Sequence, residues 1–185
     1  MADHDDLFYI NKVCSGDTAS YTVLVDRYKN MAYTLALKIM KNEDDAEDSA
    51  QEAFIKAFKQ LHSFKKESKF STWLYTIVYR TAIYNIRGKK KNIERITETN
   101  SKHHNESSIL ENIEKKEQQL LVHQAIDSLP ETEALIVTLF YINEATIAEI
   151  ETITGLSESN IKVKLFRARK KLKQKLQVTL QAELN

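Results

Sequence analysis

Residues that break helices are scarce in this chain, and this scarcity limits the folds that it can adopt. Its 185 residues include three glycines and one proline. An all-β fold needs many tight turns, which depend heavily on glycine and proline. Between the breakers, apolar residues recur every three or four positions over long segments, as in helices with one buried face. The sequence therefore predicts an all-α fold.

The first half is predicted to form one short helix and three long ones, at residues 5–14, 18–41, 44–61 and 71–87. Gly88 is expected to end the last of these, helped by the lysines that follow it. At about 100° per residue, its inward face should hold Leu74, Ile77, Val78, Thr81 and Tyr84. A separate outer strip should hold Thr76, Arg80, Ile83 and Arg87.

The composition changes after this helix. Residues 89–108 are rich in Asn, Ser, Thr, His and Lys and poor in apolar residues, which indicates a flexible linker, although parts of it could be solvated helix. The linker would divide the chain into small helical domains at 1–88 and 109–185. His103 and His104 lie in it, but no Cys or acid at ligand spacing completes a metal site. No metal or cofactor is therefore predicted.

The second domain is predicted to contain a helix-turn-helix. After a helix at about 109–128, Pro130 opens another helix that carries an apolar run. Thr146 can cap a short helix, and Gly155 should break the chain before a last long helix. A short helix, a glycine turn and a second helix form the motif that many DNA-binding proteins use.

The last helix is strongly basic. Between Ser159 and Leu176 it has eight Lys or Arg residues and no acid, although the net charge of the chain is +1. An apolar stripe should anchor one side, and the outer side should present Asn160, Lys162, Val163, Phe166, Arg167 and Lys170. Such a face offers cations for phosphates and side chains that can read base edges. The alternative, a solvated helix, usually alternates its charges.

Acidic residues are concentrated elsewhere, with six acids and no base between Glu43 and Glu52. The outer face of this helix should carry Asp48, Gln51, Glu52 and Ile55. An apolar residue among acids suits docking of a basic protein partner, and the alternative is a single exposed isoleucine without a role.

The segment before the third long helix mixes aromatic and basic residues and is predicted to be a loop: Phe64, Lys65, Lys66, Ser68, Lys69 and Phe70. Aromatic rings with nearby lysines can hold unpaired bases and their phosphates. The spacing equally allows the rings to belong to the core.

The sequence shows none of the features expected of a secreted protein, a membrane-spanning protein or an enzyme. The chain has one cysteine, an acidic start and no apolar run long enough for a membrane span, which favours a cytoplasmic protein. It has no glycine-rich phosphate loop, metal-ligand spacing or paired nucleophile and base, so we do not expect an enzyme.

Segments in both halves of the chain resemble a known family. Residues 45–87 (DAEDSAQEAFIKAFKQLHSFKKESKFSTWLYTIVYRTAIYNIR) are similar to conserved region 2 of the sigma-70 family, and residues 125–137 (AIDSLPETEALIV) and 154–172 (TGLSESNIKVKLFRARKKL) to region 4. The chain therefore resembles an extracytoplasmic-function, or group IV, sigma factor. The resemblance implies that it binds core RNA polymerase, recognises the −10 and −35 promoter elements, directs transcription initiation and has an anti-sigma partner.

The resemblance also implies roles for individual residues. Core polymerase would contact Asp48, Gln51, Glu52 and Ile55. The −10 element would contact Phe64, Lys65, Lys66, Ser68, Lys69, Phe70, Thr76, Arg80 and Arg87. The −35 element would contact Asn160, Lys162, Val163, Phe166, Arg167 and Lys170. Val163 stands where the family usually has Ser and favours a thymine methyl.

Two other classes of protein compete with this interpretation. One is a helix-turn-helix regulator that does not engage polymerase, and the other is a helical adaptor that binds only proteins. The adaptor predicts no salt-dependent affinity for DNA, whereas phosphate contacts predict a steep dependence.

Overall fold

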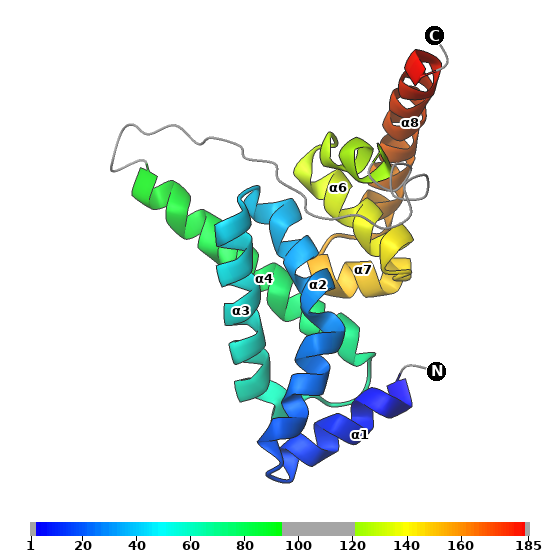
Figure 1. Cartoon of the computed structure of the whole chain (residues 1–185). Helices are drawn as coiled ribbons and strands as arrows, with labels where there is room; N and C mark the ends of the chain where they lie inside the picture. The colour runs from blue at the N-terminus through cyan, green and yellow to red at the C-terminus, as the bar shows by residue number, and fades with distance from the viewer. Residues whose placement is uncertain (1–2, 94–120, 184–185) are drawn as a thin grey trace.

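The computed structural model describes residues 3–93 and 121–183, and every regular element within these residues is helical (Figure 1). The first half contains α1 (Asp3–Cys14), α2 (Tyr21–Met40), α3 (Glu43–Gln60) and α4 (Phe70–Ile93). The second half contains a helical segment at 121–127, then α6 (Glu131–Val137), a π-helix (Thr138–Ile142), α7 (Ile147–Thr154) and α8 (Glu158–Glu183). The all-α prediction is confirmed.

Helices α2, α3 and α4 pack together as the body of the first half. Four alanines of α3 are buried at this contact, at positions 46, 50, 53 and 57, and their small side chains allow the neighbouring helices to approach closely. Asn42 caps α3, because its side chain accepts a hydrogen bond from the Asp45 backbone N–H at 2.9 Å.

Helix α1 is fixed to α2 by a buried carboxylate. Asp6 is 1% exposed and accepts hydrogen bonds from the Arg27 guanidinium and the Tyr28 hydroxyl. A carboxylate at such a position needs partners of this kind to offset its lost hydration.

The second half is built around the apolar run that the sequence indicated. Ile136, Leu139, Ile150 and Ile161 are fully buried where α6, the π-helix, α7 and α8 meet. Gly155 ends α7 with a φ of 73°, a left-handed conformation that glycine adopts without steric cost.

Helix α4 is longer than predicted. Gly88 lies inside it at an exposed position, and a glycine in a helix interior costs only about 1 kcal/mol. Beyond Gly88, Lys89 pairs with Asp45 of α3, which favours continuation of the helix. The rest of the predicted linker, His103 and His104, and the first part of the predicted helix at 109–128 lie outside the described residues.

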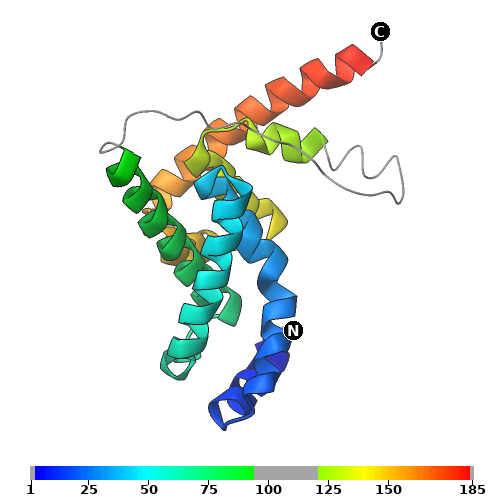
Figure 2. The same ribbon diagram turned by 60° about the vertical axis from the view of Figure 1, so that its left-hand side comes forward.

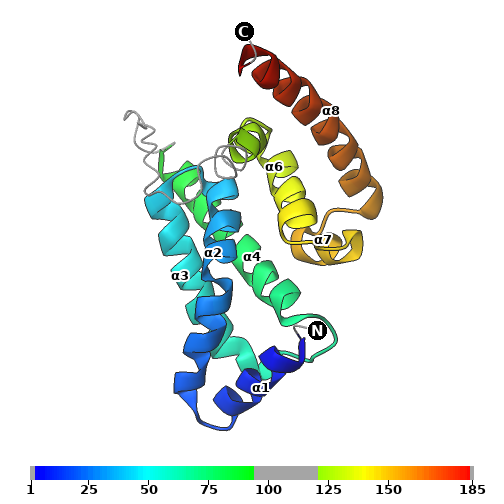
Figure 3. The same cartoon turned by 45° about the vertical axis from the view of Figure 1, so that its right-hand side comes forward.

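The two halves pack against each other and share a continuous hydrophobic core. Helix α7 contacts α4, and α6 contacts α2, as Figures 2 and 3 show from two further sides. Lys38 of α2 is almost fully buried and pairs with Asp127, which precedes α6. The contact between α7 and α4 places the helix-turn-helix beside the helix that was predicted to face the −10 element.

Candidate nucleic-acid and protein interfaces

The helix-turn-helix is formed by α7, the turn at Gly155 and α8. A capping box begins α7: the Glu149 backbone N–H donates to the Thr146 hydroxyl at 3.2 Å, and the Thr146 backbone N–H donates to Glu149 Oε2 at 2.7 Å. On α8, Ile161, Leu165 and Ala168 are buried against the domain. The helix-turn-helix that was predicted from capping residues and apolar spacing is therefore confirmed.

This anchoring turns the opposite side of α8 to solvent. All six residues predicted to read the −35 element are exposed: Asn160, Lys162, Val163, Phe166, Arg167 and Lys170. Phe166 is 70% exposed and Val163 is 44% exposed, so two apolar side chains project among the cations. A helix with this face has the size and the donor groups needed in a major groove.

One ion pair borders the α8 face. Lys162 and Glu158 lie one turn apart and are joined at 2.5 Å, and this hydrogen bond lowers the pKa of Glu158 from its usual value. Both side chains are more than half exposed. Such a pair is weak in water, so Lys162 can exchange its carboxylate partner for a phosphate.

The outer face of α3 is acidic, as predicted. Asp48 and Gln51 are exposed, and Ile55 is 56% exposed. Glu52 is only partly exposed, because it accepts hydrogen bonds from Asn85 Nδ2 at 2.8 Å and Lys56 Nζ at 2.9 Å. These bonds, that of Asn85 first, lower the pKa of Glu52 and keep it ionised.

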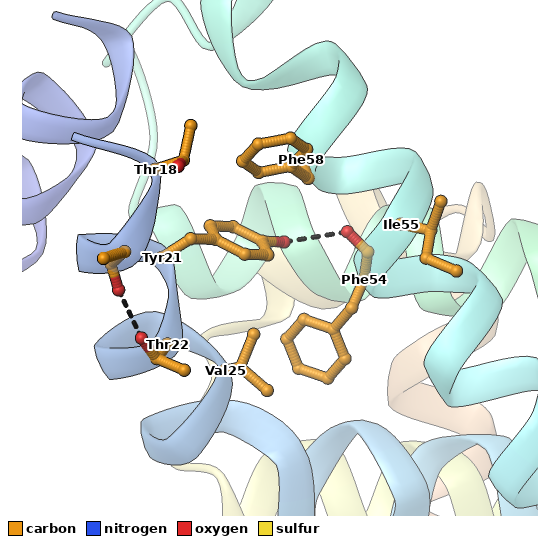
Figure 4. Close-up of a pocket in the computed structure, with 8 residues that line it drawn as sticks. Thr18, Tyr21, Thr22, Val25, Phe54, Ile55 and Phe58 are labelled. Carbon is orange, nitrogen blue, oxygen red and sulfur yellow. Dashed lines mark hydrogen bonds between the residues drawn. The ribbon is translucent and has the colours of Figure 1, made fainter. Parts of the chain in front are cut away.

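An apolar groove lies beside Ile55, between α3 and the start of α2 (Figure 4). It has a volume of about 510 Å³ and is lined by Thr18, Ala19, Tyr21, Thr22, Val25, Phe54, Ile55 and Phe58. The Tyr21 hydroxyl donates to the Phe54 carbonyl at 2.9 Å and fixes the ring at the groove (Figure 4). The α3 face thus combines carboxylates with a groove that can hold an apolar side chain.

The loop before α4 separates its lysines from its aromatic rings. Lys65, Lys66 and Lys69 are exposed, as is Ser68, whereas Phe64 and Phe70 are 7% and 2% exposed. The two phenylalanine rings pack edge-on, with centroids 5.7 Å apart, and both contact the Trp73 ring. Both rings are therefore buried in this arrangement, as the core alternative predicts, and the contact of this segment with a −10 base stays a prediction.

The faces of α4 also differ from prediction. Thr76, expected on the outer strip, is buried, and its hydroxyl donates to the Thr72 carbonyl at 2.8 Å. Tyr84, expected on the inner face, is 73% exposed. Arg80 and Arg87 are exposed as predicted. The error at Thr76 arises because α7 also packs against α4, near its start, where the Thr72 hydroxyl donates to Glu149 of α7.

Glu149 joins α7 to the predicted −10 surface. Its Oε1 atom lies 2.9 Å from Lys69 Nζ and accepts a 3.4 Å hydrogen bond from the Thr72 hydroxyl, while Oε2 completes the capping box. Burial raises the pKa of Glu149, but the hydrogen bonds from Thr146 and Lys69 together have a larger, opposite effect. The pKa of Glu149 therefore lies below its usual value. The contact therefore favours the ionised carboxylate.

No functional role was predicted from the sequence for Glu149, Lys38 or Tyr84. The Thr146–Glu149 spacing indicates a capping box, but nothing local indicates that Glu149 also reaches Lys69.

In the described ranges 3–93 and 121–183, no cluster of three potential metal ligands occurs. No helix within these ranges is long and apolar enough to cross a membrane.

Comparison with known proteins gives matches to both halves. The sigma-70 region 2 pattern matches residues 24–92, and the sigma-70 region 4 pattern matches residues 119–172. The ECF RNA polymerase sigma factor SigW of Bacillus subtilis is 30% identical over 90% of this chain and 94% of its own length. The RNA polymerase sigma-H factor of Pseudomonas aeruginosa is 29% identical over 97% of this chain and 98% of its own.

Solved structures share the fold. The sigma factor RpoE of Bartonella quintana, in complex with the anti-sigma factor NepR, has a TM-score of 0.69 at 19% identity, over 85% of this chain and 97% of that chain. CnrH, in complex with the cytosolic domain of CnrY, has a TM-score of 0.62 at 20% identity, over 96% and 99% of the chains.

A regulator with only a helix-turn-helix would not account for the region 2 match. Two sigma-70 regions in this order and a relative at 30% identity over most of both chains show that this protein belongs to the extracytoplasmic-function (ECF) RNA polymerase sigma factors of the sigma-70 family, which direct promoter-dependent transcription initiation.

Proposed function

We propose that three surfaces of this sigma factor have separate partners. The acidic α3 face, with Asp48, Gln51, Glu52, Ile55 and the neighbouring groove, docks on core RNA polymerase. The outer face of α8 reads the −35 element. The lysines of the loop before α4, together with Arg80 and Arg87, contact DNA at the −10 element. The first and third roles would belong to a domain at 1–88 and the second to a domain at 109–185, with a linker at 89–108 between them.

The observation that carries this proposal is the exposed outer face of α8. It combines two apolar side chains with cations, and the acidic α3 face lies on the other half of the chain. Purified protein mixed with core polymerase should start transcription at a cognate promoter. Binding to DNA without a promoter-dependent transcript would contradict the assigned polymerase contact.

Arg167→Ala is expected to weaken recognition of the −35 element by about 1–3 kcal/mol if the guanidinium contacts a base. Lys170→Ala is the matched control, because loss of a phosphate contact should weaken binding to all sequences equally and lower the salt slope by about 1. The measurement is a fluorescence-anisotropy titration on the cognate duplex and on duplexes altered within the −35 element. An equal loss on every sequence would limit Arg167 to a phosphate contact.

We also propose that the two halves must separate before the −10 element can bind. Lys69 is paired with Glu149, Thr76 is buried, and α7 packs against α4. The outer face of α8 is exposed in the same arrangement. An anti-sigma factor that holds the two halves together would therefore prevent access to the −10 surface, and the solved structure of the similar sigma factor RpoE is a complex with an anti-sigma factor.

Glu149→Gln is expected to favour separation of the halves. Glutamine can keep the capping box of α7 but cannot form the ion pair with Lys69. The pair is partly exposed, so its loss should shift the equilibrium by at most about five-fold, equivalent to about 1 kcal/mol. Energy transfer between dyes attached at positions 29 and 174, with Cys14 replaced by Ser, should fall.

Glu151→Gln is the matched control, since it makes the same change at an exposed position of α7. It should leave energy transfer unchanged. Low pH should act like Glu149→Gln: the contribution of Glu149 is complete above its usual pKa of 4.5 and is lost as the pH falls through the lowered pKa. Equal energy transfer in both variants would contradict a role for Glu149 in closure.

A further inference from the structure

A hydrogen bond joins the first helix to the loop before α4. Lys66 Nζ donates to Asn11 Oδ1 of α1 at 2.9 Å, although the two residues are 55 positions apart in the sequence. Helix α1 also packs against the short 3-10 helix Leu61–Ser63, which leads into the loop, and against α4, which follows it (Figure 3). Both residues of the bond are exposed. The loop is therefore joined to α1 at the surface of the protein.

The bond holds the loop at the residue where its backbone turns. Lys66 has a φ of 62°, a left-handed conformation. A residue with a Cβ atom adopts it at a cost, and it persists only where the surroundings determine it. Phe64 and Phe70 are buried at the two ends of the loop, and Lys66 lies between these fixed points. The direction of the Lys66 side chain is thus set by α1 as well as by its own loop.

The acceptor itself is held firmly. Ile10 and Val13, on either side of Asn11 in the sequence, are 2% and 7% exposed. One turn earlier, the buried carboxylate of Asp6 is bonded to two residues of α2. Because α1 is anchored at these points, the Asn11 amide is a fixed acceptor, and it can orient a long and otherwise flexible lysine.

An amide acceptor orients Lys66 without neutralising it. The ammonium has several N–H donors, so that one can bond Asn11 while the others remain for an anion. Lys69 of the same loop differs, because its charge is paired with the Glu149 carboxylate at 2.9 Å. A single exposed hydrogen bond adds little to stability in water. A lysine that is already ordered, however, loses less conformational entropy when it binds.

We propose that Asn11 is a positioning residue, which presents the fully charged Lys66 ammonium to a DNA phosphate beside the −10 element. The inference rests on the proposed −10 role of the loop, and it adds a residue of α1 that touches no DNA itself. A bond that served only to tie α1 to the loop would predict equal DNA binding by every variant that stays folded.

The test is the affinity of the whole chain, in complex with core polymerase, for a fluorescein-labelled cognate promoter duplex. Asn11→Ala should weaken binding by about 2-fold to 10-fold, the range for ordering one long side chain. Alanine favours helix more than asparagine does, so this loss would not come from unfolding of α1. Asn30→Ala makes the same change at an exposed position of α2 and should bind normally.

Salt dependence separates orientation from charge. Asn11→Ala should leave the slope of log affinity against log salt unchanged, because Lys66 still reaches its phosphate. Lys66→Ala should lower the slope by about 1. Asn11→Asp keeps an acceptor but neutralises Lys66, so it should weaken binding and lower the slope as well. In the Lys66→Ala background, Asn11→Ala should have no further effect.

Two results would overturn the positioning role alone. One is normal binding by Asn11→Ala together with a lowered slope in Lys66→Ala. The other is an equal loss from Asn11→Ala with and without Lys66. Full affinity and an unchanged slope in Asn11→Asp would show that the charge of Lys66 is not used, and would overturn the inference too.

Failure of the proposed function gives different results. An unchanged slope in Lys66→Ala would contradict the phosphate contact at this loop position and, with it, the role of Asn11. If the unmodified protein starts no promoter-dependent transcription with core polymerase, the proposed assignment of surfaces fails as a whole. A promoter-dependent transcript with normal binding by Asn11→Ala leaves that assignment intact and removes only the inference.

Discussion

Ile55→Glu is expected to weaken binding to core RNA polymerase by about 30-fold or more, equivalent to at least about 2 kcal/mol. Ile55 is the apolar residue of the acidic α3 face and lines the groove next to it. The substitution removes the apolar contact and adds a carboxylate where a basic partner would approach. Because the side chain is 56% exposed, α3 should remain folded.

The measurement is the affinity of labelled protein for core polymerase, with far-UV circular dichroism as the check on folding. Ile55→Ala should show a smaller loss, because it removes the apolar contact without adding a charge. Asn30→Glu adds the same charge at an exposed position of α2 and should bind normally. Core affinity that is unchanged in Ile55→Glu would refute the docking role of the α3 face.

Phe70→Ala is expected to lower the free energy of unfolding by about 3–5 kcal/mol. Phe70 is 2% exposed and packs between rings from α2 and α4, with centroids 5.6 Å from Tyr28 and 5.7 Å from Trp73. Removal of its ring would leave a cavity where these aromatic side chains meet. Such a loss is a large fraction of the stability of an ordinary domain, about 5–15 kcal/mol.

Urea unfolding followed by circular dichroism measures this effect. Phe166→Ala is the matched control: it removes the same ring from a site that is 70% exposed and should change stability by less than about 0.5 kcal/mol. The two variants should separate stability from function, because Phe166→Ala should reduce −35 binding while the fold persists. If Phe70→Ala kept full stability and lost only −10 binding, the ring would be a base pocket and not part of the core.

Much of the candidate site could be predicted because it depends on local periodicity. The apolar stripe of α8 determines which side of the helix faces solvent, so all six predicted −35 residues are exposed. The same reasoning placed Ile55 correctly on the outer face of α3. In both helices one side packs against the domain, and the spacing of the apolar residues is sufficient to identify that side.

Local periodicity failed on α4, where the number of packed neighbours changes along the helix. Near its start α4 packs against other helices of the first half and also against α7, so Thr76 is buried although it is polar. Near its end the helix extends past the bundle (Figure 1), and Tyr84 is exposed although it is aromatic. Helical periodicity gives the angle of a side chain about the axis but not which elements cover it.

By itself, the sequence determined the all-α class, the helix-turn-helix and the two oppositely charged surfaces, because hydrogen bonding, capping and periodicity act over a few residues. Only the tertiary structure decided that the two halves are closed on each other. The pairs Lys38–Asp127 and Lys69–Glu149 join residues that are far apart in the chain. No local pattern specifies such pairs, because they form only when the apolar surfaces of both halves pack into a shared core.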